Sequence, residues 1–219
     1  MASKHVRIPP AEAGLPAQAV VVRRRPRQAR ARLSTEALQQ AFVRVLLERG
    51  YARTTIREVA AVAGVGVGTF YEYFGNMRSL AAKCISEAVR GAERSGRAAC
   101  APLAGQPRAA IAAALIERLA TDIGADTATW SALFLLERQI STPAAYREHY
   151  ERWVDMWAQA LGSASDPPAR LAAVARMAHS ISYGWISQRL LTGEAGSLDA
   201  QELHVDLKQA VLAYLHSAA

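Results

Sequence analysis

The residues best suited to binding chemistry in this sequence lie in one short stretch, GVGVGTFYEYF, at positions 64–74. Three glycines stand at alternate positions, and aromatic residues fill four of the five positions from 70 to 74. Glycines can bring backbone N–H groups close to a phosphate, which would make the stretch a nucleotide-binding loop. They can also form a tight turn before a helix that meets a large surface. These two interpretations require different flanking sequences.

The flanking residues argue against a nucleotide-binding loop. Such a loop needs a preceding strand, the spacing G-x-G-x-x-G and an acidic residue about twenty positions later in a βαβ unit. Here the spacing is G-x-G-x-G, position 69 is a threonine, and the flanking segments have helical periodicity. A phosphate loop of the Walker type is excluded as well, because no Gly-Lys-Ser/Thr follows the glycines.

The stretch fits the turn of a helix-turn-helix, in which two short helices cross. Ala60 provides a small residue where the helices would touch, and Gly64 permits a left-handed backbone at the turn. Apolar side chains would hold the second helix against the core, while two tyrosines would reach outward. The core residues are Val65, Phe70 and Phe74, and the outward residues are Tyr71 and Tyr73.

At these residues the sequence resembles a known family. Residues 54–80, TTIREVAAVAGVGVGTFYEYFGNMRSL, resemble the DNA-binding head of the TetR family of bacterial transcriptional regulators, and the resemblance covers roughly residues 33–82. The positions that match the family pattern are Ala60, Ala63, Gly64, Val65, Gly68, Thr69, Tyr71, Tyr73, Phe74 and Leu80. Two departures lie on the binding surface. Gly66 and Val67 replace a common Ser-Lys pair, and Met77 replaces a frequent phosphate-binding lysine, with Arg78 beside it.

The resemblance implies a homodimer that binds a near-palindromic operator in double-stranded DNA and releases it when a small-molecule effector binds. The DNA-contacting residues that it implies are Thr54, Thr55, Gly66, Val67, Gly68, Thr69, Tyr71, Tyr73 and Arg78. We therefore predict a ligand-responsive transcriptional regulator that acts as a repressor. The alternative is an effector-independent DNA-architecture protein that uses the same head.

Charge is distributed in agreement with a DNA-binding head. Residues 1–90 hold 15 Lys and Arg against 6 Asp and Glu, whereas residues 91–219 hold 11 against 13. A basic half beside a nearly neutral half indicates a nucleic-acid-binding part joined to a separate body. Six arginines fall within residues 23–32, and we predict that this arm reaches the minor groove beside the operator. They are Arg23, Arg24, Arg25, Arg27, Arg30 and Arg32.

The periodicity of apolar residues predicts an all-α fold of about nine helices. Residues 1–31 carry four prolines and no amphipathic period, so we expect a flexible basic arm. A helix-turn-helix domain would follow over residues 32–80, and an effector-binding and dimerisation body over residues 81–219. The first helix would begin at Ser34 or Thr35, and Asn76 would cap a long helix that reaches the mid 90s. Further helices are expected at 108–123, 127–141, 143–162, 167–192 and 199–217.

The body contains all four tryptophans of the chain, and two i,i+4 pairs, Trp130 with Phe134 and Trp153 with Trp157, each lie on one face of a helix. We predict an effector pocket lined by Trp130, Phe134, Trp153, Trp157 and Tyr183. The last two helices would pair with those of a second subunit in a four-helix interface. The expected seam residues are Leu171, Val174, Ile181, Leu190, Leu203, Leu207, Val211 and Leu215.

The remaining chemistry of the sequence favours neither catalysis nor metal binding. The five histidines form no pair at ligand spacing, and neither a nucleophile elbow nor a pair of catalytic carboxylates is present. We therefore predict no enzyme activity, no cofactor and no metal. Cys84 and Cys100 are compatible with a reducing compartment, and no apolar run approaches the length of about 18 residues that a membrane span requires. The expected location is the cytoplasm.

Overall fold

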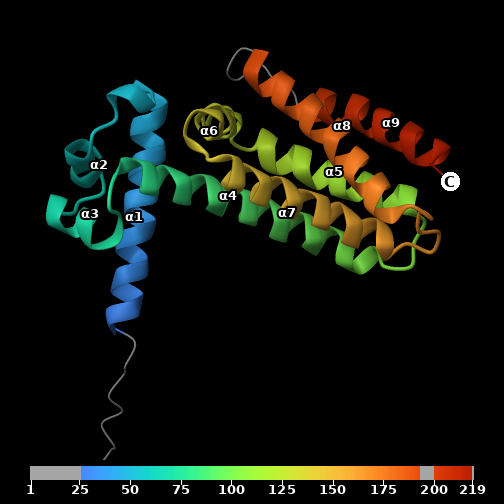
Figure 1. Ribbon diagram of the computed structural model, residues 1–219, viewed down its shortest axis with the longest axis horizontal. Coiled ribbons are helices and arrows are strands. Elements are labelled where there is room, and N and C mark those ends of the chain that lie inside the picture. Colours follow the sequence, from blue (N-terminus) through green and yellow to red (C-terminus); the bar gives the residue numbers. More distant parts are fainter. Residues whose placement is uncertain (1–25, 193–199, 219) are drawn as a thin grey trace, which may run out of the picture.

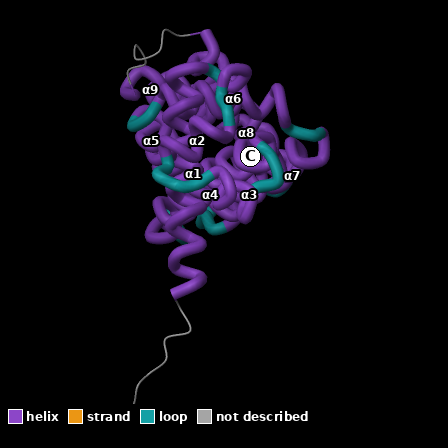
Figure 2. Tube along the Cα trace, turned by 90° about the vertical axis from the view of Figure 1, so that its left-hand side faces the viewer, coloured by secondary structure: helices purple, strands orange, loops and turns teal. Residues whose placement is uncertain are grey.

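A computed structural model describes residues 26–192 and 200–218. Over these ranges the chain consists of nine α-helices and two short 3-10 turns, with no strand, so the all-α prediction is confirmed. Three N-terminal helices form a head at one end of the molecule, and five later helices form an elongated body (Figure 1). Helices and short connecting loops make up the whole described chain (Figure 2).

The head comprises α1 (Pro26–Arg49), α2 (Ile56–Val62) and α3 (Val67–Tyr73). Helix α1 begins earlier than predicted, since Thr35 lies inside the helix and its hydroxyl donates to the carbonyl of Ala31. Residues 26–31 are thus helical, which corrects the boundary of the expected arm. Proline favours the first position of a helix, and arginine, glutamine and alanine are strong helix formers. Arg23, Arg24 and Arg25 lie outside the described residues.

The helix-turn-helix forms as the sequence predicts. Gly64 has a φ of 68°, and the N–H of the next residue donates to the carbonyl of Ala60 across the turn. Ala60, Phe70 and Phe74 are buried. A single hydrophobic cluster, here called the head cluster, joins these helices to two later ones. It consists of Leu38, Ala41, Phe42, Val45, Leu46, Val59, Phe70, Phe74, Leu80, Ala81, Cys84, Ile85, Leu133, Leu136 and Ile140.

Helix α4 (Met77–Cys100) leads from the head into the body (Figure 1). Asn76 caps it as predicted, because its side-chain oxygen accepts a 2.9 Å hydrogen bond from the N–H of Ser79. The first half of α4 supplies residues 80–85 to the head cluster. The second half packs into the body, where a Cβ on Gly96 would lie 2.7 Å from the Sδ of Met156. Close packing here leaves no room for a larger residue.

The body contains α5 (Arg108–Gly124), α6 (Thr127–Ile140), α7 (Pro143–Gly162), α8 (Leu171–Thr192) and α9 (Ala200–Ser217). These bounds agree with the predicted ones to within four residues, because side-chain caps and prolines mark several of them. A second hydrophobic cluster, the body cluster, fills the space between the helices. It consists of Ala92, Cys100, Ile111, Ala112, Leu115, Ile116, Leu119, Ala120, Ile123, Met156, Trp157, Ala160, Leu161, Val174, Ala175, Ala178, Ile186, Leu190, Leu207, Val211 and Leu215.

The predicted dimer seam is wrong at most of its positions. Five of the eight side chains belong to the body cluster and are at most 4% exposed, so they cannot contact a second subunit. These five are Val174, Leu190, Leu207, Val211 and Leu215. Only Leu171 and Ile181 retain partial exposure, and the side chain of Leu203 lies outside the described residues. The helical period was identified correctly, but the core-facing stripe was taken for the outer one.

Over the described ranges, none of the helices is both long and apolar enough to cross a membrane.

Candidate DNA-binding surface and ligand cavity

Helix α3 presents a smooth outer surface at its N-terminal end. Gly66 occupies the N-cap position and supplies no side-chain hydrogen bond, and both Gly66 and Gly68 have open space where a Cβ would stand. Val67 is 40% exposed and Tyr71 is 57% exposed, whereas Thr69 is half-buried. The predicted outward direction of Tyr71 is therefore observed. This end of the helix offers backbone N–H groups, one aliphatic side chain and one phenol to a partner.

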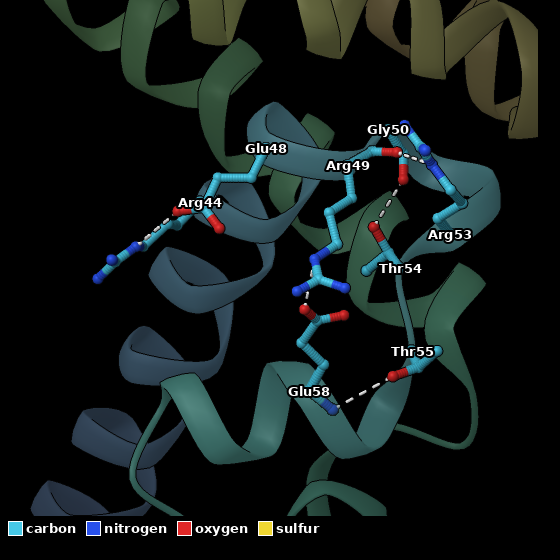
Figure 3. A network of polar contacts seen from close by, with 8 residues as sticks. All are labelled: Arg44, Glu48, Arg49, Gly50, Arg53, Thr54, Thr55 and Glu58. Atoms are coloured by element: carbon cyan, nitrogen blue, oxygen red, sulfur yellow. Dashed lines mark hydrogen bonds and ion pairs between the residues drawn. The ribbon is translucent and has the colours of Figure 1, made fainter.

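The N-terminus of α2 is fixed to α1 by a network of polar contacts (Figure 3). The Thr55 hydroxyl caps α2 by accepting from the N–H of Glu58 at 3.3 Å. The carboxylate of Glu58 pairs with Arg49 of α1 at 2.7 Å. The Thr54 hydroxyl donates to the carbonyl of Gly50 at 2.9 Å. Both threonines thus have structural roles beside their predicted DNA contacts.

Two exposed arginines near this network were missed by the sequence reasoning. Arg57 lies in the first turn of α2 and has no described hydrogen bond or ion pair, and the exposed Arg53 donates to the carbonyl of Arg49 at 2.9 Å. They stand four positions apart on either side of the threonines. Their spacing could have identified them as candidate phosphate contacts, because it places two cations beside a helix N-terminus, which itself favours anions.

The remaining residues predicted to contact DNA include a tyrosine at the end of α3 and arginines on α1. Tyr73 is half-buried against the head cluster. Arg30 and Arg32 are exposed on α1, where Arg32 lies 3.5 Å from Glu36, and Arg27 belongs to the same helix. These arginines extend along a helix and not along a free arm.

Arg78 contacts the body. Its Nε donates to the carbonyl of Ile140 at 3.0 Å, and its Nη2 donates to the same oxygen. Ile140 is the last residue of α6, so the guanidinium caps a helix C-terminus, where a positive charge is favourable. The residue predicted to contact DNA thus connects the first turn of α4 to the end of α6.

The five residues predicted for an effector pocket line one cavity in the body. Its volume is about 30 Å³, room for little more than one water molecule. The other lining residues are three aliphatic residues, a histidine and a serine, which were not predicted because the sequence gives no pattern that brings these separate helices together. The complete lining is Leu119, Ile123, Trp130, Phe134, Trp153, Trp157, His179, Ser182, Tyr183 and Ile186.

His179 is the unexpected member of this lining. It is 4% exposed, its ring is parallel to that of Trp153 with centroids 6.2 Å apart, and Tyr183 lies 5.7 Å away. Burial lowers the pKa of His179 to about 4, and the nearby charge of Arg176 adds to this shift while Glu151 opposes it. The imidazole is therefore neutral at pH 7.

A smaller cavity of about 20 Å³ adjoins the first and shares four of its residues, Trp130, Phe134, Trp153 and Tyr183. Its remaining walls include Ile85 and Val89 of α4 and Glu137 of α6. Glu137 is buried and lies 2.6 Å from Nδ1 of His149. Movement of the shared aromatic side chains would join the two cavities and extend the space toward α4.

Helix α6 belongs to both halves of the molecule. Leu133, Leu136 and Ile140 are members of the head cluster, whereas Trp130 and Phe134 pack against the body cluster and line the cavity. One short helix therefore contacts both the DNA-binding head and the candidate ligand site.

The structure thus consists of a helix-turn-helix head that is joined through shared helices to an all-α body with an internal cavity. Residues 40–84 match the family model for bacterial regulatory proteins of the tetR family. The head is thus a TetR-type head, as the resemblance predicted, and the whole chain has the fold of TetR-family regulators. A comparison with curated protein sequences finds no match.

Solved structures agree with this fold. FadR of Bacillus subtilis in complex with stearoyl-CoA superposes with a TM-score of 0.67 at 17% identity, covering 82% of this chain and 98% of its own. A TetR transcriptional regulator from Rhodococcus sp. RHA1 gives 0.58 at 18% identity, with coverages of 87% and 100%. FadR of Thermus thermophilus in complex with lauroyl-CoA gives 0.57 at 19% identity, with coverages of 81% and 93%.

The buried neutral imidazole predicts a loss of stability in mild acid. Because the unfolded chain takes up a proton at His179 that the folded chain excludes, its contribution is complete above pH 6.5 and is lost as the pH falls toward 4. The slope from one such group is at most about 1.4 kcal/mol per pH unit. The free energy of unfolding, measured with urea at several pH values, should change less with pH between 6.5 and 5 in the His179→Phe variant than in the wild type.

His216→Phe provides the control, since it makes the same substitution at an exposed imidazole outside the cavity. The chosen range lies above the pH at which Glu87, Glu117 and Glu151, whose pKa values are lowered by neighbouring cations, begin to take up protons. Equal slopes for His179→Phe and wild type would show that the imidazole is solvated.

Proposed function

We propose that this protein is a homodimeric transcriptional repressor that releases its operator DNA when a small molecule enters the aromatic cavity. The observation that carries the proposal is the position of α6, which contributes to the head cluster on one face and to the cavity on another. This arrangement supports an effector-responsive regulator over an effector-independent DNA-architecture protein, because such a protein has no use for a coupled cavity.

In this proposal α3 enters the major groove, with Val67, Gly68 and Tyr71 toward the bases. Thr55 and the exposed Arg53 and Arg57 would contact phosphates at the edge of the groove. The two heads of a dimer must reach successive major grooves about 34 Å apart, so the operator would be nearly palindromic.

Dimerisation would use the outer faces of α8 and α9, which pack side by side along one side of the body (Figure 1). Met177 on α8 is 48% exposed and Val205 on α9 is 51% exposed. Ile181 and Gly184 continue the stripe on α8 at helical spacing, and Leu212 is partly exposed on α9. These residues replace the seam predicted from the sequence.

The effector would act by displacing side chains. A cavity of about 30 Å³ cannot hold a small organic molecule, so binding must move some of the aromatic residues that separate it from the second cavity. Displacement of Trp130 and Phe134 would shift α6 and with it Leu133, Leu136 and the carbonyl that Arg78 holds. An effector that prefers the shifted arrangement lowers operator affinity by its differential binding to the two arrangements.

Two FadR proteins with this fold were solved in complex with acyl-CoA molecules, so acyl thioesters are one of the compound classes that the effector screen should include. The function is tested by selecting bound sequences from a random DNA pool and then screening small molecules for release of the selected operator. Failure to enrich any sequence would exclude a specific regulator. Enrichment without release by any effector would leave the architectural alternative.

Replacement of Tyr71 by Phe should weaken operator binding without affecting the fold, because only an exposed hydroxyl is removed. One hydrogen bond is worth about 0.5–1.5 kcal/mol, so two heads together should lose roughly 5- to 150-fold in affinity. Tyr214→Phe is the control, since it removes a hydroxyl from a half-buried tyrosine on α9 of the body. Fluorescence anisotropy of labelled operator measures both. Equal affinities would assign Tyr71 to another role.

Introduction of a charge into the α8–α9 stripe should dissociate the dimer. Met177→Arg would bury a cation at the centre of the proposed apolar interface, which is strongly unfavourable. Leu135→Arg changes an equally exposed apolar residue on α6 and should leave the association unchanged. Sedimentation equilibrium at micromolar concentration distinguishes monomer from dimer. Dimers of Met177→Arg as stable as wild type would place the interface elsewhere.

Loss of the Arg78 contact should uncouple the two halves. With an effector found in the screen, Arg78→Gln should reduce the ratio of operator affinities measured without and with that effector by several-fold, since coupling energies are typically 1–3 kcal/mol. Arg94→Gln, an exposed change on the same helix, should keep the wild-type ratio. A variant that binds operator weakly but responds normally to the effector would identify Arg78 as a phosphate contact.

A further inference from the structure

We propose that the effector is an uncharged molecule with at least one aromatic ring and a hydrogen-bond acceptor, and that this acceptor binds the indole N–H of Trp157. The inference rests on the proposed function, because it takes the aromatic cavity as the effector site. It adds the chemical class of the ligand and the residue that recognises its polar group.

The aromatic character of the ligand follows from a continuous series of ring contacts around the cavity. Phe134 lies 6.2 Å from Trp130 and 5.5 Å from Tyr183, measured between ring centroids. His179 continues the series between Tyr183 and Trp153. Aromatic side chains favour offset and edge contacts with other rings, which contribute beyond the area they bury. A flat ring could therefore replace one of these contacts as it enters.

The lack of charge in the ligand follows from the lining, in which no residue is charged. Entry of an isolated carboxylate or ammonium group would carry a large desolvation penalty, and the lining itself holds no opposite charge to offset it. The adjoining carboxylate of Glu137 is already paired with His149.

An aromatic cage can attract cations, but here an arginine already uses two of the rings. The guanidinium of Arg138 lies 6.0 Å from the ring centroid of Phe134 and 5.8 Å from that of Tyr183, and it is exposed. It would repel a second cation at the same rings. An uncharged ligand avoids both the desolvation penalty and this repulsion.

The hydrogen-bond acceptor of the ligand is inferred from a buried donor in the cavity wall that has no partner. Trp157 is fully buried, lines the cavity, and its Nε1–H has no hydrogen-bond partner among the described residues. The indole N–H of Trp130 donates to the carbonyl of Asp122 at 3.3 Å, and the Ser182 hydroxyl donates to that of Ala178 at 2.8 Å. A buried donor without a partner costs about 1–3 kcal/mol, and a ligand acceptor would recover part of this.

The experiment compares benzophenone with diphenylmethane, which share two phenyl rings and differ in the carbonyl acceptor. Isothermal titration calorimetry of the full-length protein should give roughly five- to tenfold tighter binding for benzophenone. Diphenylmethane is the more apolar compound, so simple partition into an apolar cavity would produce the opposite order. The charged analogue 4-benzoylbenzoate should bind more weakly than benzophenone, as should stearoyl-CoA.

Trp157→Phe should abolish the preference for benzophenone over diphenylmethane, because the two ligands then meet the same donor-free wall. Trp185→Phe is the matched control, because its indole N–H is also buried and unpartnered but does not line the cavity. If Trp157→Phe does not fold, ¹⁵N NMR of the four tryptophan indoles in the wild-type protein provides a second measurement. The Trp157 proton should shift downfield with benzophenone and not with diphenylmethane.

Several outcomes would overturn the inference. The first is equal affinity for benzophenone and diphenylmethane, and the second is tighter binding of 4-benzoylbenzoate or stearoyl-CoA than of benzophenone. The others are an unchanged preference for benzophenone in Trp157→Phe and no binding of any of these compounds. Operator selection is an independent measurement, so the ligand class can fail while the regulatory function stands. Absence of any selected operator would instead overturn the proposed function and leave these affinities interpretable as binding alone.

Discussion

The architecture depends on the packing of α6 against two hydrophobic clusters at once. Residues 133, 136 and 140 lie on one face of this helix, and residues 130 and 134 lie on a neighbouring face. Protein interiors are close-packed, so a displaced helix cannot be accommodated by unused space. A movement of α6 that enlarges the cavity would therefore also disturb its contacts with the head cluster. This shared helix is the basis of the proposed coupling between the cavity and the head.

Helix α4 is the second element that connects the head to the body. It is the covalent connection between head and body, and its first turn carries the arginine that caps the end of α6. The two helices thus pack against each other and are joined by hydrogen bonds at one point. Because the Arg78 side chain is itself largely exposed, these hydrogen bonds add little stability alone. Their effect is to hold the first turn of α4 at the C-terminal end of α6.

Local signals made most of the fold predictable, whereas contacts between distant residues did not. The turn at Gly64 and the cap at Asn76 were predicted correctly because each depends on a few adjacent residues. The start of α1 was wrong because clustered arginines were interpreted by charge and not by helix propensity. The partner of Arg78 is 62 positions away, which no local pattern reveals. Trp130 and Phe134, like Trp153 and Trp157, were found through their i,i+4 spacing, whereas His179, four positions before Tyr183, was not recognised as part of the same aromatic series.

The two cysteines have a practical consequence for measuring the proposed dimer. Both thiols are buried, and burial raises the pKa of Cys84 to about 12 and also raises that of Cys100. Neither is an accessible thiolate, so both should react slowly with thiol-specific reagents. A single cysteine added to the exposed face of α3 would then be the preferred site for a spin label. Electron paramagnetic resonance could then measure the separation of the two heads in the proposed dimer without removal of the native cysteines.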